Sequence, residues 1–168
     1  MDATSKPANP VVREGIVAGI IGATSVAVWF FIIDMIAGHP LQTPAALGHG
    51  FFSFFGSTMG ESETLHVAGY TVVHYLAFCA LGIGASAMVN VSEKVPAALA
   101  GLFILFVASQ LAFYGATAIL SMSAALGGMT WWSVGLANLI AAVAMGRYVY
   151  RRHPNLRHTL EYALSGKE

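Results

Sequence analysis

The chain of 168 residues is 57% hydrophobic and only 10% charged, and its mean hydropathy is +0.69. An ordinary soluble domain is about 45–50% apolar and about 25% charged, so this composition excludes a soluble enzyme, a disordered chain and a nucleic-acid-binding protein. Eight basic residues balance eight acidic ones, and a single cysteine excludes an intramolecular disulfide and a cysteine-rich metal site. What remains is a small integral membrane protein with one membrane domain, residues 1–168.

Four stretches are long enough to cross the hydrocarbon core, which takes about 20 apolar residues in a helix. They run from about 11 to 37, 65 to 89, 95 to 122 and 131 to 150. These stretches are apolar on all sides, which favours helices over strands. The first is longer than the apolar part of a signal peptide and is followed by no clear cleavage site, so we interpret it as a retained anchor. The sequence predicts an all-α, antiparallel bundle of four transmembrane helices.

All Lys and Arg residues fall on one side of this arrangement: Lys6, Arg13, Lys94, Arg147, Arg151, Arg152, Arg157 and Lys167. The positive-inside rule therefore places both termini in the cytoplasm. The basic tail, residues 151–168, follows the last span. One interpretation of this basic region is contact with anionic lipid headgroups, through Arg147, Arg151, Arg152 and Arg157. The positive-inside bias alone also explains why these residues are basic.

The first outer loop, residues 38–64, is long for a simple connection and contains a short apolar segment. Thr43 followed by Pro44 is typical of an N-cap and a first helical position, which predicts a helix over 44–55. Leu47, Phe51 and Phe55 share one face of that helix. At about 12 residues it is too short to span, so it either lies at the outer interface or re-enters the membrane.

Small residues four positions apart predict close packing between the helices. The pairs are Gly15/Gly19, Ala18/Gly22, Ala97/Gly101, Ala137/Ala141 and Ala142/Gly146. The two glycines at 82 and 84 indicate a close contact or a slight kink in the second span. Cys79 lies mid-span, where we interpret it as a small packing residue.

Polar residues inside the spans are the best hints of function, because they must face protein or water. His74, Gln110 and Asn138 are predicted at similar depth, about 10–15 Å from the outer boundary. His66, Tyr70 and His74 form a stripe on one face of the second span. The full predicted intramembrane cluster is Asp34, His66, Tyr70, His74, Gln110 and Asn138. It serves either as hydrogen-bond glue between helices or as the lining of a proton, ion or small-ligand path.

Asp34 lies near the outer end of the first span and has two interpretations of its own. It is either a structural tie, neutralised or bonded to His39 or His66, or a functional carboxylate with a raised pKa.

Histidines near the outer loop allow a metal-site hypothesis with His39, His49 and His66 as ligands, and with Asp34, Glu61 and Glu63 as oxygen donors. Their spacing matches none of the usual metal motifs. Binding of haem by two axial histidines requires two histidines at the same depth in the membrane on different helices. Only His74 lies deep in a span, so one chain would not hold a haem. We therefore predict no cofactor.

Three segments carry a resemblance: Trp29–Pro40 (WFFIIDMIAGHP), Tyr70–Phe78 (YTVVHYLAF) and Trp131–Pro154, which contains WWSVGLANL and RYVYRRHP. On these the chain resembles small uncharacterised four-transmembrane-helix proteins of bacteria, over most of its length. The resemblance implies a bacterial inner (cytoplasmic) membrane protein and transfers no activity or catalytic residue.

The sequence predicts a non-enzymatic protein, an accessory or structural subunit or a self-associating helical bundle. Its expected partners are membrane lipids and other membrane subunits or a second copy of itself. The first alternative is a small transporter or proton/ion conduit that uses the intramembrane cluster. The second is a metal-binding protein of the outer face.

Overall fold

A computed structural model gives the fold for residues 10–56, 62–92, 95–119 and 131–153. These residues form only helices: α1 (Pro10–Ile36), α2 (Gln42–Phe54), α3 (Glu63–Ser92), α4 (Leu99–Ile119) and α5 (Trp131–Arg152), with a short 3-10 helix, η1 (Pro96–Ala98), before α4. The predicted helical class is confirmed. Three helices, α1, α3 and α5, are long and apolar enough to cross a membrane, which indicates a membrane protein.

The third predicted span, residues 95–122, corresponds to η1 followed by α4. Its first residues form η1, so α4 itself runs from Leu99 to Ile119 and has 21 residues. Pro96 is the first residue of η1, a position that proline favours because its fixed φ suits a helix and its missing N–H would have no partner in the helix anyway. The last residues of the predicted span lie outside the described ranges.

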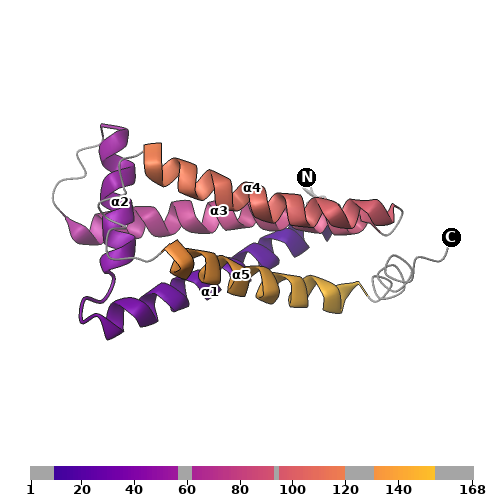
Figure 1. The fold of residues 1–168 in the computed structure, drawn as a ribbon, viewed down its shortest axis with the longest axis horizontal. Coiled ribbons are helices and arrows are strands. Elements are labelled where there is room, and N and C mark those ends of the chain that lie inside the picture. Colours follow the sequence, from indigo (N-terminus) through magenta and orange to yellow (C-terminus); the bar gives the residue numbers. More distant parts are fainter. Residues whose placement is uncertain (1–9, 57–61, 93–94, 120–130, 154–168) are drawn as a thin grey trace, which may run out of the picture.

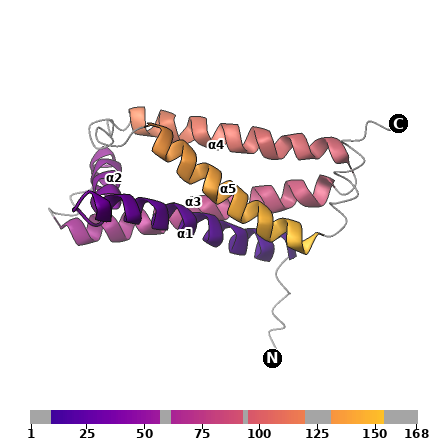
Figure 2. The same ribbon diagram turned by 60° about the horizontal axis from the view of Figure 1, so that its bottom comes forward.

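The long helices lie lengthwise beside one another, and α2 lies across one end of them (Figure 1). The turned view shows the same arrangement, with α2 again crossing the end where α1 finishes and α3 begins (Figure 2). The start of α1 and the end of α5 are both at the opposite end. The chain therefore leaves α1, crosses this end of the bundle in α2 and returns along α3.

Glycines bring α1 and α3 into backbone contact. A Cβ atom added at Gly19 would lie 2.5 Å from Cα of Cys79, and one added at Gly82 would lie 2.7 Å from the backbone nitrogen of Gly19. Gly15 faces Ile83 in the same way. Because residue numbers rise along α1 as they fall along α3, these two helices run in opposite directions. Side chains this small allow the helix backbones to approach closely enough for extensive van der Waals contact.

Helix α5 packs against α1 through its alanines. Ala137 and Ala141 are almost fully buried against Val26, and Trp29 donates a hydrogen bond from Nε1 to the hydroxyl oxygen of Ser133, 3.2 Å away. Nearer the other end, a second apolar cluster joins the three helices α1, α3 and α5, through Ala18, Val89 and Val149 respectively. The small-residue face predicted at positions 137 and 141 is therefore a packing face within this chain.

Helix α2 begins two residues earlier than predicted. The helix starts at Gln42, after Leu41 in a left-handed conformation (φ 70°), so Thr43 is inside the first turn and not at the N-cap. Leu47 is buried, whereas Phe55 lies beyond the helix end and is exposed. A Cβ at Gly48 would lie 2.7 Å from the carbonyl carbon of His66, so this glycine lets α2 pack closely on α3.

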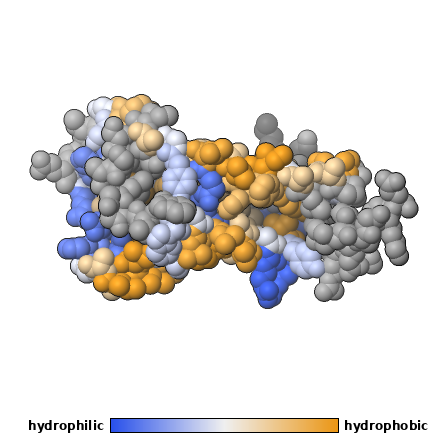
Figure 3. Space-filling view, in the orientation of Figure 1, coloured by the Kyte–Doolittle hydropathy of each residue, from blue (hydrophilic) through white to orange (hydrophobic). Residues whose placement is uncertain are grey.

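The surface reflects this arrangement. In the space-filling view, hydrophobic surface follows the length of the helices, and hydrophilic surface gathers around α2 and towards the C-terminal end of α5 (Figure 3). This distribution, apolar along the helices and polar towards both ends, is the one that a bilayer favours.

Candidate functional site

Asp34, near the end of α1, is buried and holds the start of α2. Its Oδ2 accepts a hydrogen bond of 2.8 Å from the backbone N–H of Thr43, and its Oδ1 accepts one of 2.7 Å from the Thr43 hydroxyl. The carboxylate thus satisfies a backbone donor in the first turn of α2 that has no partner within the helix. The sequence suggested that the Asp34 side chain bonds to His39 or His66. In the structure its carboxylate bonds to Thr43 instead.

His66 is buried at the start of α3, beneath α2. Its ring centroid lies 5.2 Å from that of His49 in an edge-to-face arrangement, and it stacks on Phe52 at 6.5 Å. His39 lies elsewhere, on a surface pocket of about 430 Å³ that it shares with Gln42 and Glu63. Among the described residues, no three His, Cys, Asp or Glu side chains gather closely enough to hold a metal ion, and Glu61 lies outside those residues.

His74 and Tyr70, one turn apart on α3, occupy a different environment. Nε2 of His74 lies 3.1 Å from the backbone oxygen of Ala23 on α1. A carbonyl oxygen can only accept, so Nε2 carries the proton. The rings of Tyr70 and His74 stack with centroids 5.7 Å apart, and His74 also contacts Phe78 at 4.8 Å. The predicted stripe is therefore divided, because His66 faces α2 while Tyr70 and His74 lie further along α3.

Gln110 and Asn138 join α4 to α5. The side-chain amide of Asn138 donates a hydrogen bond to Oε1 of Gln110. The sequence placed both residues at a similar depth, and the fold brings them into direct contact. Of the six residues in the predicted cluster, this is the only pair that a side-chain hydrogen bond joins in the described part of the chain. The cluster is therefore a set of separate local contacts.

An elongated cavity of about 890 Å³ lies between the helices. Its α2 end is lined by Leu47 and Phe51, and its other end by Val89, Leu102 and Val149. The described lining is almost entirely apolar and contains no Asp, Glu, Lys or Arg side chain. Its polar members are Tyr70, His74, Ser109, Asn138 and Tyr150. A cavity of this size falls within the range of about 300–1,000 Å³ that is usual for small-molecule sites.

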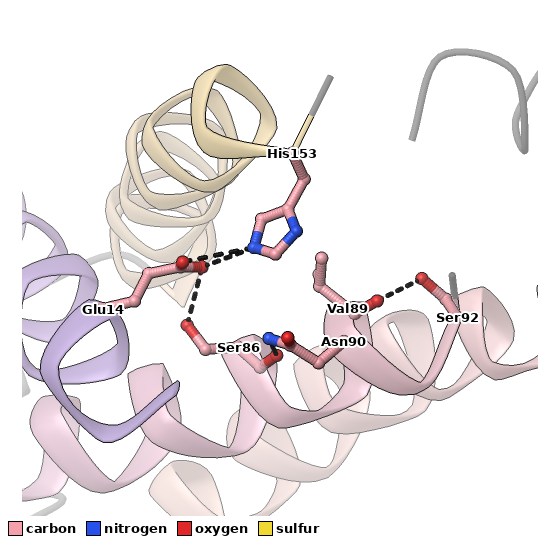
Figure 4. A network of polar contacts seen from close by, with 6 residues as sticks. All are labelled: Glu14, Ser86, Val89, Asn90, Ser92 and His153. Atoms are coloured by element: carbon pink, nitrogen blue, oxygen red, sulfur yellow. Dashed lines mark hydrogen bonds and ion pairs between the residues drawn. The ribbon is translucent and has the colours of Figure 1, made fainter. Parts of the chain in front are cut away.

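A further polar network, which the sequence did not indicate, joins three helices at the end opposite α2. Nε2 of His153 lies 3.1 Å from both carboxylate oxygens of Glu14, and the Ser86 hydroxyl donates a hydrogen bond of 3.3 Å to Glu14 Oε1 (Figure 4). Asn90 then donates to the backbone oxygen of Ser86 at 2.8 Å. Glu14 and His153 are 139 positions apart, so no local motif could have paired them.

The basic residues of α5 lie near this network. Arg147, Arg151 and Arg152 are exposed, and the guanidinium carbon of Arg152 lies 5.3 Å from the ring centroid of Tyr148. An exposed cation beside an aromatic ring is common near a membrane interface. Arg157 lies outside the described residues.

Comparison with known proteins gave no match: no family model, no curated protein and no solved structure is similar to this chain. Function has to be argued from the chain's own residues.

Several titratable side chains in the described ranges are engaged by other parts of the chain. Asp34 is engaged by Thr43, Glu14 by His153 and Ser86, and Nε2 of His74 by a backbone oxygen. Of the two pockets described above, the apolar cavity is the larger. The arrangement is suited to holding helices together and to accommodating apolar groups.

Proposed function

We propose that the chain is a non-enzymatic integral membrane protein that works by association, as an accessory or structural subunit of a larger membrane assembly or as a homo-oligomer. The observation that carries this proposal is how the polar side chains at depth are used. Asp34, His74 and the Gln110–Asn138 pair each tie one segment of the chain to another, which is the role of interhelical glue.

The exposed apolar surface supports the same proposal. Only 17–33% of the residues in the most apolar stretches of α1, α3 and α5 are buried within the chain. The remainder must face lipid or other helices, and a chain with such short extramembrane parts has little else to present to a partner.

The proposed topology has four crossings, with both termini in the cytoplasm of a bacterial inner membrane. Support for a fourth crossing comes from α4, whose 21 residues rise about 31 Å, close to the thickness of the hydrocarbon core. The distribution of Lys and Arg supports the orientation.

The experiment is a tagged pull-down from native membranes in mild detergent, with mass spectrometry of proteins recovered in fixed stoichiometry. Larger subunits recovered in this way would identify an accessory chain, and a defined oligomer of the chain alone would identify self-association. A monomer without partners would contradict the proposal.

A liposome assay separates this proposal from the conduit alternative. We expect the reconstituted protein to carry no more proton or ion flux than empty liposomes, because the described cavity lining has no charged side chain. A flux that His74→Ala abolishes would contradict the accessory role and favour a conduit.

A further inference from the structure

We propose that the interhelical cavity is a binding site for a single-chain lipid alcohol, with the hydroxyl head at Tyr70 and His74 and the chain along α3. This goes beyond the association proposed above and does not depend on it. It rests on three properties of the cavity: its shape, the lack of charge in its described lining, and two polar atoms that have no partner in the described chain.

The shape of the cavity suits an extended chain. Tyr70 and Val89 both line it and are nineteen positions apart on α3, so the cavity follows this helix for about 28 Å. An extended apolar chain fits along this length, with its head at the α2 end and its tail towards Val89.

The lining determines the chemistry of the occupant. Apolar cavities of this kind are not favourable for water, which needs two to four polar partners. The described lining also offers no cation for a phosphate or carboxylate head, because it contains no Lys or Arg. An uncharged head group on an apolar chain fits both conditions.

Two polar atoms near the α2 end of the cavity indicate the chemical group of the uncharged head. The Tyr70 hydroxyl has no hydrogen-bond partner among the described residues, although it lies in an apolar span. His74 uses Nε2 on Ala23, and its Nδ1 likewise has no partner in the described ranges. An unsatisfied polar group within a membrane is costly, so an occupant that satisfies both atoms stabilises the bound state.

A hydroxyl satisfies both atoms at once. With the proton of the neutral His74 ring on Nε2, Nδ1 is an acceptor and needs a donor. The Tyr70 hydroxyl can donate to an oxygen. A lipid hydroxyl donates to Nδ1 and accepts from Tyr70, whereas an ether or ketone can only accept.

The test uses hexadecanol that carries a photoactivatable diazirine in its chain and an alkyne at its tail, with the full-length protein in lipid nanodiscs. Labelled peptides are mapped by mass spectrometry, and unlabelled hexadecanol or hexadecyl methyl ether is added as competitor. We expect label on α3 and α5 residues that line the cavity. We also expect hexadecanol to compete and the methyl ether, which lacks the donor, to compete poorly.

Matched variants identify the site. Tyr70→Phe should weaken competition by hexadecanol roughly fivefold to tenfold, the equivalent of one hydrogen bond. Tyr75→Phe is its control, because the Tyr75 hydroxyl bonds to Thr24 and Tyr75 is not part of the lining. Ala112→Trp should block the cavity, whereas Leu111→Trp, at an exposed position of α4 that does not line the cavity, should leave labelling unchanged.

Three results would overturn the proposal. Label spread over exposed faces and insensitive to excess hexadecanol would mean that bulk lipid is the only partner. Equal competition by the methyl ether, or unchanged affinity in Tyr70→Phe, would remove the assigned head site. A dimer that Ala112→Trp disrupts, without competition by hexadecanol, would assign the cavity to a second copy of the chain.

Discussion

Glu14, in the second turn of α1, and His153, directly after α5, face each other with both carboxylate oxygens 3.1 Å from Nε2. The two side chains are only 12% and 11% exposed. Through Ser86 the same carboxylate reaches α3, so one acidic residue joins three helices at the end opposite α2. This contact joins the first and last described helices of the chain.

We expect Glu14→Gln to lower the free energy of unfolding by about 1–2 kcal/mol, because the amide keeps one acceptor but loses the charge that strengthens both contacts. The measurement is unfolding in detergent, with a double-mutant cycle that pairs Glu14→Gln with His153→Gln. Glu63→Gln, at an exposed acidic residue in the first turn of α3, is the control and should change stability by no more than about 0.5 kcal/mol. A coupling energy near zero in the cycle would show that the Glu14–His153 contact contributes nothing to stability.

Asp34→Ala should release the start of α2. It leaves the buried N–H and hydroxyl of Thr43 without their acceptor, which costs about 1–3 kcal/mol. We expect faster hydrogen exchange at the amides of α2 and little change in α5. Asp34→Asn, which retains an acceptor oxygen, should give an intermediate effect. Unchanged exchange in Asp34→Ala would mean that packing of Leu47 and Gly48 on α3 alone holds α2.

The helices could be predicted from the sequence because their signals are local. Each long apolar stretch gave a helix within a few residues of its expected bounds, and the glycines at 15, 19 and 82 marked the closest contact between two helices. The start of η1 at Pro96 agrees with the preference of proline for the first helical position. These features depend on a residue and its near neighbours along the chain.

The contacts of the candidate site depend on tertiary geometry, and the sequence could not specify them. Thr43 resembles an N-cap by spacing, but Leu41 turns the chain so that Thr43 meets Asp34. His153 meets Glu14 only because α1 and α5 share an end. Estimated depths in the membrane correctly placed Gln110 near Asn138. The cavity could not be predicted in this way, because it depends on the distance between α4 and α5, which no local sequence pattern encodes.

The close approach of α1 and α3 predicts a contrast between two glycines in one helix. Gly82→Ala places a Cβ against the backbone of Gly19, and we expect it to cost about 1–3 kcal/mol in unfolding free energy because neither backbone can yield. Gly84→Ala is the matched control, since its Cβ meets only Cδ2 of Leu105 at 3.7 Å, an ordinary contact. We expect Gly84→Ala to be neutral or slightly stabilising, because alanine favours a helix. Equal effects of the two substitutions would show that the α1–α3 contact is looser than described.

The number of membrane crossings can be tested by labelling cysteines from one side of the membrane. In a Cys79→Ser background, Gln42→Cys and Arg151→Cys each provide a single exposed thiol, beside α2 and at the end of α5 respectively. If α1, α3, α4 and α5 each cross once, the two positions lie on opposite sides. A membrane-impermeant maleimide applied to intact cells should then label position 42 but reach position 151 only after permeabilisation. If α4 does not cross, α5 would end on the same side as α2, and both positions would be labelled in intact cells. Labelling of position 151 alone would reverse the orientation that the basic residues predict.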